Sequence, residues 1–124
     1  VQIDYETIAN CALEQIGKKY SKNGRGPNTY DSIGLVLECY AKAGQSLPQS
    51  TGQICQSGRA IKNSDAIPGD IVCMDILLTG AVNHVGIVIN DSQAVFVVDR
   101  IGQQVQQKEI PQDFDIFKGI RHIE

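Results

Sequence analysis

The sequence predicts an α+β protein in which N-terminal helices pack on an antiparallel sheet of about five strands. In the first half of the chain, apolar residues recur at the three- and four-residue spacing of a helix face. After Pro68-Gly69 the pattern changes to short apolar runs separated by turn residues, which is typical of consecutive strands. Helices followed by successive strands indicate an α+β fold with an antiparallel sheet.

The first helix is expected over Tyr5–Ile16. Asp4 is a residue type that caps helix N-termini, and Gly17 ends the periodic pattern. One helix face carries Ile8, Ala12 and Ile16 at four-residue spacing, with Cys11 beside them. The polar residues from 18 to 29, which include two glycines and a proline, are expected to form a loop.

The second helix is expected from Ser32 to Ala43, with Asp31 as its N-cap and Gly44 as its stop. Its apolar positions form a wide stripe, which predicts a buried helix. These positions are Leu35, Val36, Cys39, Tyr40 and Ala43. A short third helix is expected over Thr51–Ser57, capped by Ser50.

The second half of the chain is expected to supply the strands. They are Asp70–Met74, Asn83–Ile89, Ala94–Asp99, Val105–Lys108 and Phe117–His122. Asn90 to Gln93 carries turn residues, so the second and third strands should form a hairpin. The sequence shows no internal repeat or linker, and residues 1–124 are expected to form a single domain.

Composition and charge argue against several classes of function. The net charge is -3 and the pI is about 5.3, without a basic stripe, so a nucleic-acid partner is not expected. The apolar runs are too short to span a membrane. We expect a monomer without cofactors. The chain begins at Val1 without a signal peptide, as in a mature secreted form or a trimmed one.

The four cysteines are Cys11, Cys39, Cys55 and Cys73. No two of them have C-x-x-C spacing, and only two histidines could add ligands, so a metal site is not expected. Four cysteines allow three disulfide pairings. Because each cysteine lies within an apolar pattern, the sequence favours four buried thiols.

His84 is the candidate for a catalytic base, although a lone histidine on a strand is often structural. A base needs a partner that orients its second nitrogen. A two-residue turn centred on Asp91-Ser92 would place Asp99 opposite His84 and make Asp99 that partner. Asp99 could instead be a solvated strand end. A turn one or two residues earlier would pair His84 with Val97 or Phe96.

Ser32 stands where a nucleophile would be well placed, at the first turn of an apolar helix. The free N–H groups and partial positive charge at a helix N-terminus stabilise an anion there. A cysteine at this position would be a strong candidate for an activated thiolate. Serine is also a common helix cap, so the residue by itself leaves both interpretations open.

Four segments, in order, resemble the NlpC-type cell-wall peptidases, which are papain-like cysteine endopeptidases. The run from Gly17 to Val36 is similar to the nucleophile region of that family and aligns without a gap. The others are Gly44-Gln45-Ser46-Leu47-Pro48, Ile67-Pro68-Gly69-Asp70-Ile71-Val72 and His84-Val85-Gly86-Ile87. Together these segments cover nearly the whole chain.

The resemblance implies a papain-like fold that hydrolyses peptidoglycan stem peptides, typically between D-glutamate and a diamino acid. It also implies a secreted or cell-envelope location. In this sequence Ser32 takes the nucleophile position and His84 takes that of the base. Tyr20 and Asp31 match residues of the substrate-binding cleft, with the tyrosine near the oxyanion site.

The sequence departs from the family pattern at three places. Ser32 replaces the nucleophilic cysteine, and Lys22 and Asn23 replace an aromatic residue and a glycine of the cleft wall. The base-orienting residue of the family is polar and lies on the strand after the histidine. Its usual spacing gives Phe96 here, whereas a longer hairpin would give Asp99.

With serine at the nucleophile position the chain is expected to be inactive, because a hydroxyl is far less acidic than a thiol. The retention of Tyr20, Asp31 and His84 favours a deliberate replacement of cysteine by serine. The alternative is a natural pseudoenzyme that binds peptidoglycan or another peptide. The remaining candidates are a serine hydrolase, an acyltransferase, and a displaced nucleophile at Cys55 or Cys73.

Overall fold

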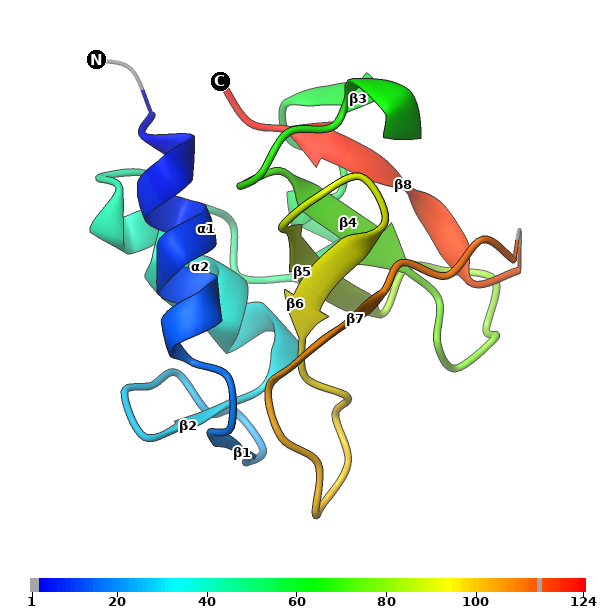
Figure 1. The fold of residues 1–124 in the computed structure, drawn as a ribbon. Coiled ribbons are helices and arrows are strands. Elements are labelled where there is room, and N and C mark those ends of the chain that lie inside the picture. Colours follow the sequence, from blue (N-terminus) through cyan, green and yellow to red (C-terminus); the bar gives the residue numbers. More distant parts are fainter. Residues whose placement is uncertain (1–2, 114) are drawn as a thin grey trace.

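Helices α1 and α2 pack against one face of a six-stranded antiparallel sheet (Figure 1). The computed structural model describes residues 3–113 and 115–124. The helical elements are α1 (Tyr5–Glu14), α2 (Ser32–Lys42), α3 (Thr51–Ile54) and a 3-10 turn at Asn63–Asp65. The strands are β1 (Lys19–Tyr20), β2 (Thr29–Tyr30), β3 (Arg59–Ile61), β4 (Ile71–Met74), β5 (His84–Val88), β6 (Gln93–Phe96), β7 (Gln106–Glu109) and β8 (Phe117–His122). The α+β prediction is confirmed.

Both long helices begin at the caps that the sequence predicts. The Asp4 carboxylate accepts a hydrogen bond from the Thr7 N–H at 3.2 Å, and that of Asp31 accepts one from the Gly34 N–H at 2.6 Å. α1 ends two residues earlier than predicted, at Glu14. Ile16 therefore lies outside the helix, where it is 44% exposed and not part of the core.

The large sheet has the strand order β3-β8-β4-β5-β6-β7. All five predicted strands are present, and each of their ends lies within three residues of the predicted one. The sequence missed β3 on the outer edge, since its exposed and half-buried residues show no apolar alternation. It also missed the small parallel pair β1–β2, which holds the loop before α2.

The predicted register of the β5–β6 hairpin is wrong by one position. Val88 pairs with Ala94. If this register continued to His84, the residue opposite would be the one before Asp99. The side chain of Asn90 accepts hydrogen bonds of 3.0 Å from the backbone N–H groups two and three positions later, and this lengthens the turn by one residue. β6 also ends at Phe96, so Asp99 lies in the following loop and not in the strand.

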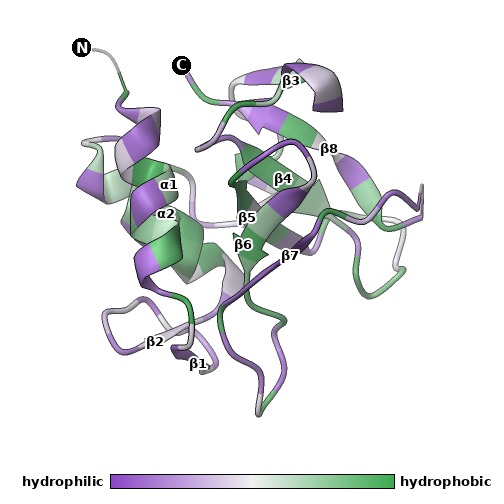
Figure 2. Cartoon of the chain, in the orientation of Figure 1, coloured by the Kyte–Doolittle hydropathy of each residue, from purple (hydrophilic) through white to green (hydrophobic). Residues whose placement is uncertain are grey.

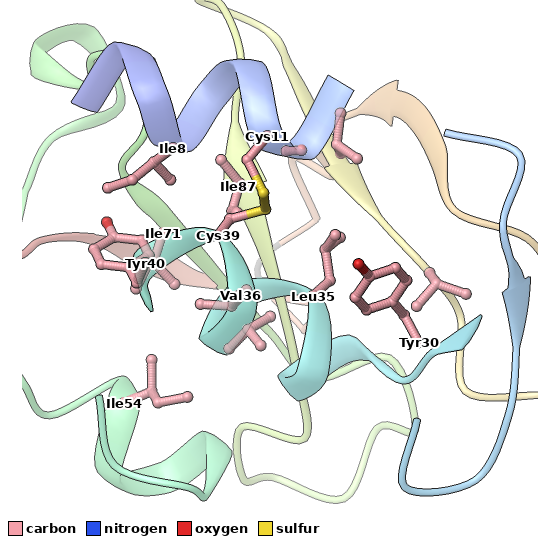
Figure 3. Close-up of a cluster of buried hydrophobic side chains, with 14 of the residues drawn as sticks. Ile8, Cys11, Tyr30, Leu35, Val36, Cys39, Tyr40, Ile54, Ile71 and Ile87 are labelled. Carbon is pink, nitrogen blue, oxygen red and sulfur yellow. A yellow bond between two sulfur atoms is a disulfide. The ribbon is translucent and has the colours of Figure 1, made fainter. Parts of the chain in front are cut away.

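Buried apolar side chains form one cluster on each face of the sheet. The larger cluster lies between the helices and the sheet, and Figure 3 shows α2 contributing Leu35, Val36 and Tyr40 to it. The smaller cluster on the opposite face includes Val72, Met74, Val88, Ala94, Phe96, Ile110 and Ile120. Figure 2 shows the same division, with apolar colour on α2 and the inner strands and polar colour along β7. None of the described helices is long and apolar enough to cross a membrane.

The four cysteines form two disulfides, so the prediction of four buried thiols is wrong. Cys11–Cys39 joins α1 to α2, and Cys55–Cys73 joins the end of α3 to β4. An apolar setting suits a buried thiol and a buried disulfide equally well, so the sequence pattern could not distinguish them. The disulfides also leave neither Cys55 nor Cys73 as a free nucleophile.

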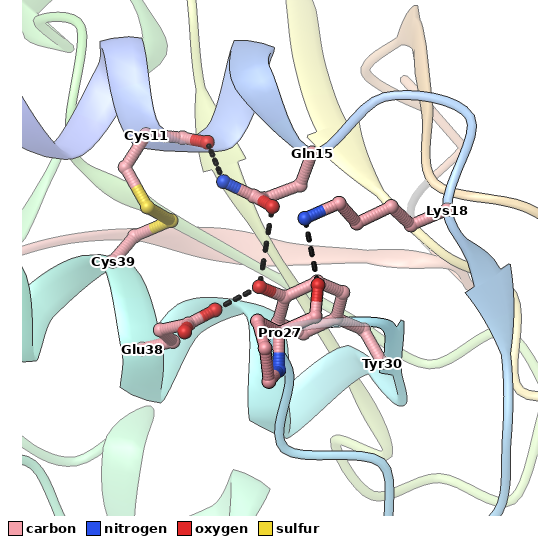
Figure 4. Close-up of a disulfide and its surroundings, with 7 residues drawn as sticks. All are labelled: Cys11, Gln15, Lys18, Pro27, Tyr30, Glu38 and Cys39. Carbon is pink, nitrogen blue, oxygen red and sulfur yellow. Dashed lines mark hydrogen bonds between the residues drawn. A yellow bond between two sulfur atoms is a disulfide. The ribbon is translucent and has the colours of Figure 1, made fainter.

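The first disulfide lies beside a buried polar network that holds the loop before α2 (Figure 4). The Tyr30 hydroxyl contacts Glu38 of α2 and Gln15 at the end of α1, and Gln15 donates to the Cys11 carbonyl at 3.0 Å. The disulfide therefore joins α1 to the second half of α2, and the Tyr30 hydroxyl joins the loop before α2 to both helices.

Candidate active site at the start of α2

The backbone at the start of α2 is set by a close approach of the preceding loop. A Cβ atom at position 34 would lie 2.0 Å from the carbonyl oxygen of Gly24, so only glycine fits there. The same carbonyl accepts the N–H of Asp31 at 3.1 Å. The loop thus packs directly on the first turn of the helix and fixes the position of Ser32.

Asp31 is already engaged within the protein. One of its carboxylate oxygens caps Gly34, and both accept hydrogen bonds from Arg25 at 2.7 Å. Sequence reasoning placed Asp31 in the cleft but missed Arg25. The available signal was a cation six residues before the acid, in the same loop.

Ser32 is completely buried, and its polar groups bind Asp99. Its backbone N–H donates to one carboxylate oxygen of Asp99 at 2.9 Å, and its hydroxyl donates to the other at 3.1 Å. Asp99 comes from the loop between β6 and β7 and is exposed. Ser32 is therefore covered by an acidic side chain.

The carboxylate end of Asp99 is partly buried against Ser32. This burial raises the pKa of the Asp99 carboxyl, because a charged group loses solvation there. The two hydrogen bonds from Ser32 and the positive charge of Arg25 lower the same pKa, whereas the negative charge of Asp31 raises it.

His84 begins β5 and is 2% exposed. Its Nε2 atom is buried without a hydrogen-bond partner among the described residues. The Phe96 ring packs edge-on against the imidazole, with 5.4 Å between ring centroids. Burial, together with the nearby charge of Lys108, lowers the pKa of His84 to about 4. The imidazole is therefore neutral at pH 7.

The structure brings the site residues predicted from sequence together only in part. His84 and Asp99 line one small cavity of about 70 Å³, together with Ile76, Leu77, Asn83 and Val98. Within residues 3–113 and 115–124, no hydrogen bond joins His84 to Asp99 or to Ser32. The partner of Asp99 is Ser32, and the neighbour of His84 is Phe96.

Tyr20 lies in β1, directly beside the segment that leads into α2. It pairs with Tyr30 in the short parallel ladder and is half-buried against the core. Its backbone N–H donates to the Gln103 carbonyl at 2.9 Å, so β1 also contacts the loop that carries Asp99.

The described residues include no group of three or more histidine, cysteine, aspartate or glutamate side chains arranged to hold a metal ion. The side chains gathered here supply a hydroxyl, two carboxylates, a guanidinium, a phenol and a neutral imidazole.

Comparison with known proteins gives a consistent match. Residues 17–116 match the NlpC/P60 family. Over 88 residues the chain is 39% identical to the probable endopeptidase p60 of Listeria monocytogenes, an alignment that covers 71% of this chain. The aligned part makes up 18% of the p60 protein, so the chain spans less than a fifth of that relative's length.

Solved structures are similar over almost the entire chain. NlpC1 from Trichomonas vaginalis superposes with a TM-score of 0.85 and 26% identity, covering 98% of this chain and 44% of that protein. RipD from Mycobacterium tuberculosis superposes with a TM-score of 0.78 and 21% identity, covering 100% of both chains. RipD is described as a non-catalytic NlpC/p60 domain protein adapted to peptidoglycan binding.

Proposed function

Because the chain belongs to the NlpC/P60 family, we propose that it binds peptidoglycan stem peptides at the start of α2 without cutting them. One observation carries this proposal. The Ser32 hydroxyl is buried and donates a hydrogen bond to Asp99, and no hydrogen bond connects it to His84 within the described part of the chain.

The chemistry of the site supports binding over catalysis. A serine nucleophile needs a base that accepts its proton, and that base needs a partner on its other nitrogen. His84 faces the apolar ring of Phe96 and has an unpartnered Nε2. In the chain with Ser32, burial and the charge of Lys108 lower the pKa of His84 to about 4, so the imidazole is neutral at pH 7.

The wider structure supports a role at the cell wall. RipD provides a precedent for a domain of this fold that binds peptidoglycan without catalysis. Two disulfides are typical of proteins that work in an oxidising compartment, outside the cytoplasm. These observations support a secreted or cell-envelope location.

The second candidate is a cysteine endopeptidase whose nucleophile has been replaced by Ser32. The preserved helix N-terminus, the Asp31 cap and the histidine at the start of β5 favour it. In that form the enzyme would cut the bond between D-glutamate and the diamino acid. A replacement at position 32 alone would not explain why the apolar ring of Phe96 packs against His84, where the family has a polar residue that orients the base.

The test compares the chain with its Ser32→Cys variant on one substrate, a muramyl tripeptide that carries a diamino acid. We expect the unchanged chain to bind the peptide, with amide NMR shifts at Ser32, Asp99 and Leu77. The amide resonances of the distant edge strand β3 should not shift. Mass spectrometry should find no cleavage by either protein.

Two results would overturn the proposal. Cleavage by the cysteine variant would support the endopeptidase candidate. If the unchanged chain did not bind the muramyl tripeptide, the proposed binding function would be wrong.

A further inference from the structure

We propose that Asp99 is an internal occupant of the ligand site, so that the 97–105 segment covers the start of α2 until a ligand oxygen displaces this carboxylate. This inference rests on the proposed function and specifies how a stem peptide gains access. The ligand group it names is a carboxylate or a peptide carbonyl.

The hydrogen bonds of Asp99 are those that a bound carboxylate would make. Both carboxylate oxygens are used, one by the first N–H of a helix and one by a hydroxyl. Helix N-termini bind anions in this way, because their N–H groups are free and their field is positive. Asp99 lies 67 positions from Ser32 in the sequence, so only the tertiary structure supplies this contact.

Burial shows that Asp99 is a cover and not part of the packed core. Ser32 has no exposed surface, whereas Asp99 itself is exposed. A ligand cannot reach the Ser32 N–H while Asp99 occupies it. Displacement of Asp99 moves a side chain that already faces solvent, and no core residue has to leave its place.

The 97–105 segment has fixed ends and a solvated middle. Val97 and Val105 are fully buried, and the Val105 N–H donates to the Lys18 carbonyl at 2.8 Å. Between these ends Ile101 is 92% exposed. In Figure 1 the segment connects β6 to β7 and extends past the sheet beside β1 and β2. Such a segment can move at its middle without unfolding the sheet.

The charged groups around Asp99 have opposite effects on its carboxylate. Asp31 repels the carboxylate and Arg25 attracts it, and the imidazole of His84, which lines the same cavity, is neutral. A thiol in place of the Ser32 hydroxyl would contact the same carboxylate. The negative charge would then disfavour the thiolate.

This effect on a thiol allows a test that needs no peptide. The four native cysteines are all in disulfides, so Ser32→Cys introduces a single free thiol. Its alkylation by iodoacetamide is measured against pH, with and without Asp99→Asn. We expect Asp99→Asn to lower the thiol pKa by about one unit and to raise the rate at pH 7 about tenfold.

The matched control is Asp91→Asn in the exposed β5–β6 turn, which should change neither quantity. Equal reactivity of the Ser32→Cys protein with and without Asp99→Asn would overturn the inference. A faster reaction in the Asp91→Asn control would do the same, because the effect would then not be local.

A second measurement separates this inference from the proposed function. In the Ser32 background, Asp99→Asn should tighten binding of the muramyl tripeptide several-fold, because the internal competitor is weakened. Weaker or unchanged binding would overturn the inference. If no variant binds the peptide but Asp99→Asn still activates the thiol, the proposed function fails and the covering role of Asp99 stands.

Discussion

At the scale of single residues, the environment of His84 favours the neutral form of its imidazole. The imidazole is buried, its Nε2 is unpartnered in the described structure, and Lys108 adds a repelling positive charge. All three features favour the neutral ring. His84 therefore packs against Phe96 as a neutral ring.

We predict that His84 titrates with a pKa near 4 in the folded protein. Its unfolded pKa is about 6.5, so the stability that the neutral ring contributes is complete above pH 6.5. That stability is lost as the pH falls toward 4, by an amount on the order of 3 kcal/mol. NMR titration gives the pKa directly, and Lys108→Gln should raise it.

Chemical denaturation between pH 7 and 4 checks the linked stability. His84→Gln should remove the share of the pH dependence that His84 contributes, whatever its effect at pH 7. An imidazole that titrates near 6.5 would contradict the burial argument. Lys42→Gln, at the far end of α2, is the control that should leave the His84 pKa unchanged.

At the scale of elements, the first turn of α2 is held by contacts that its own sequence cannot reveal. The Gly24 carbonyl fills the space where a side chain at position 34 would lie. Tyr30, Gln15 and Glu38 connect the incoming loop to both helices. A helix start of this kind keeps its backbone N–H groups in place whether or not the residue at position 32 is catalytic.

We predict that Gly34→Ala destabilises the protein by several kcal/mol, although alanine favours an exposed helix interior by about 1 kcal/mol. The reason is the 2.0 Å approach of the Gly24 carbonyl oxygen to the new Cβ. Gly52→Ala in α3 is the matched control, since nothing lies within 4 Å of its added Cβ. The free energy of unfolding of both variants is measured with urea. Equal values for the Gly34→Ala and Gly52→Ala variants would contradict the prediction, because the loop at Gly24 would then move aside at little cost.

At the scale of the whole molecule, one disulfide joins the two long helices and the other joins α3 to the sheet. Cys11–Cys39 closes 28 residues within the helical layer, and Cys55–Cys73 closes 18 residues between α3 and β4. Each disulfide limits how far its two elements can separate in the unfolded chain. These constraints stabilise a chain of 124 residues, whose core is modest in size.

We predict that replacing either cysteine pair by alanine lowers the free energy of unfolding by roughly 3–4 kcal/mol. The closed loops are similar in length, so chain entropy predicts nearly equal losses. A much larger loss for the Cys11/Cys39 pair would show that packing between α1 and α2 adds to the effect. No loss for either pair would contradict the disulfide assignment. Denaturant unfolding under oxidising conditions is the measurement.

Much of this molecule follows from local sequence patterns. The helix caps at Asp4 and Asp31 and the five strands of the second half were predicted, because capping and periodicity depend on neighbours in sequence. The family was identified from short ordered motifs, and it is confirmed. The edge strand β3 was missed, because a short exposed strand carries no periodic signal.

The sequence by itself therefore determined the fold class, the family and the place of Ser32 at a helix start. Tertiary structure decided the disulfide pairing and the partners of the site residues. Asn90 lengthened a turn by one residue, and that shift took Asp99 out of register with His84. The path of the loop after β6 brings Asp99 into hydrogen-bonding contact with Ser32. Packing within the sheet places the ring of Phe96 against His84. Contacts between distant residues depend on the whole path of the chain, which no local pattern specifies.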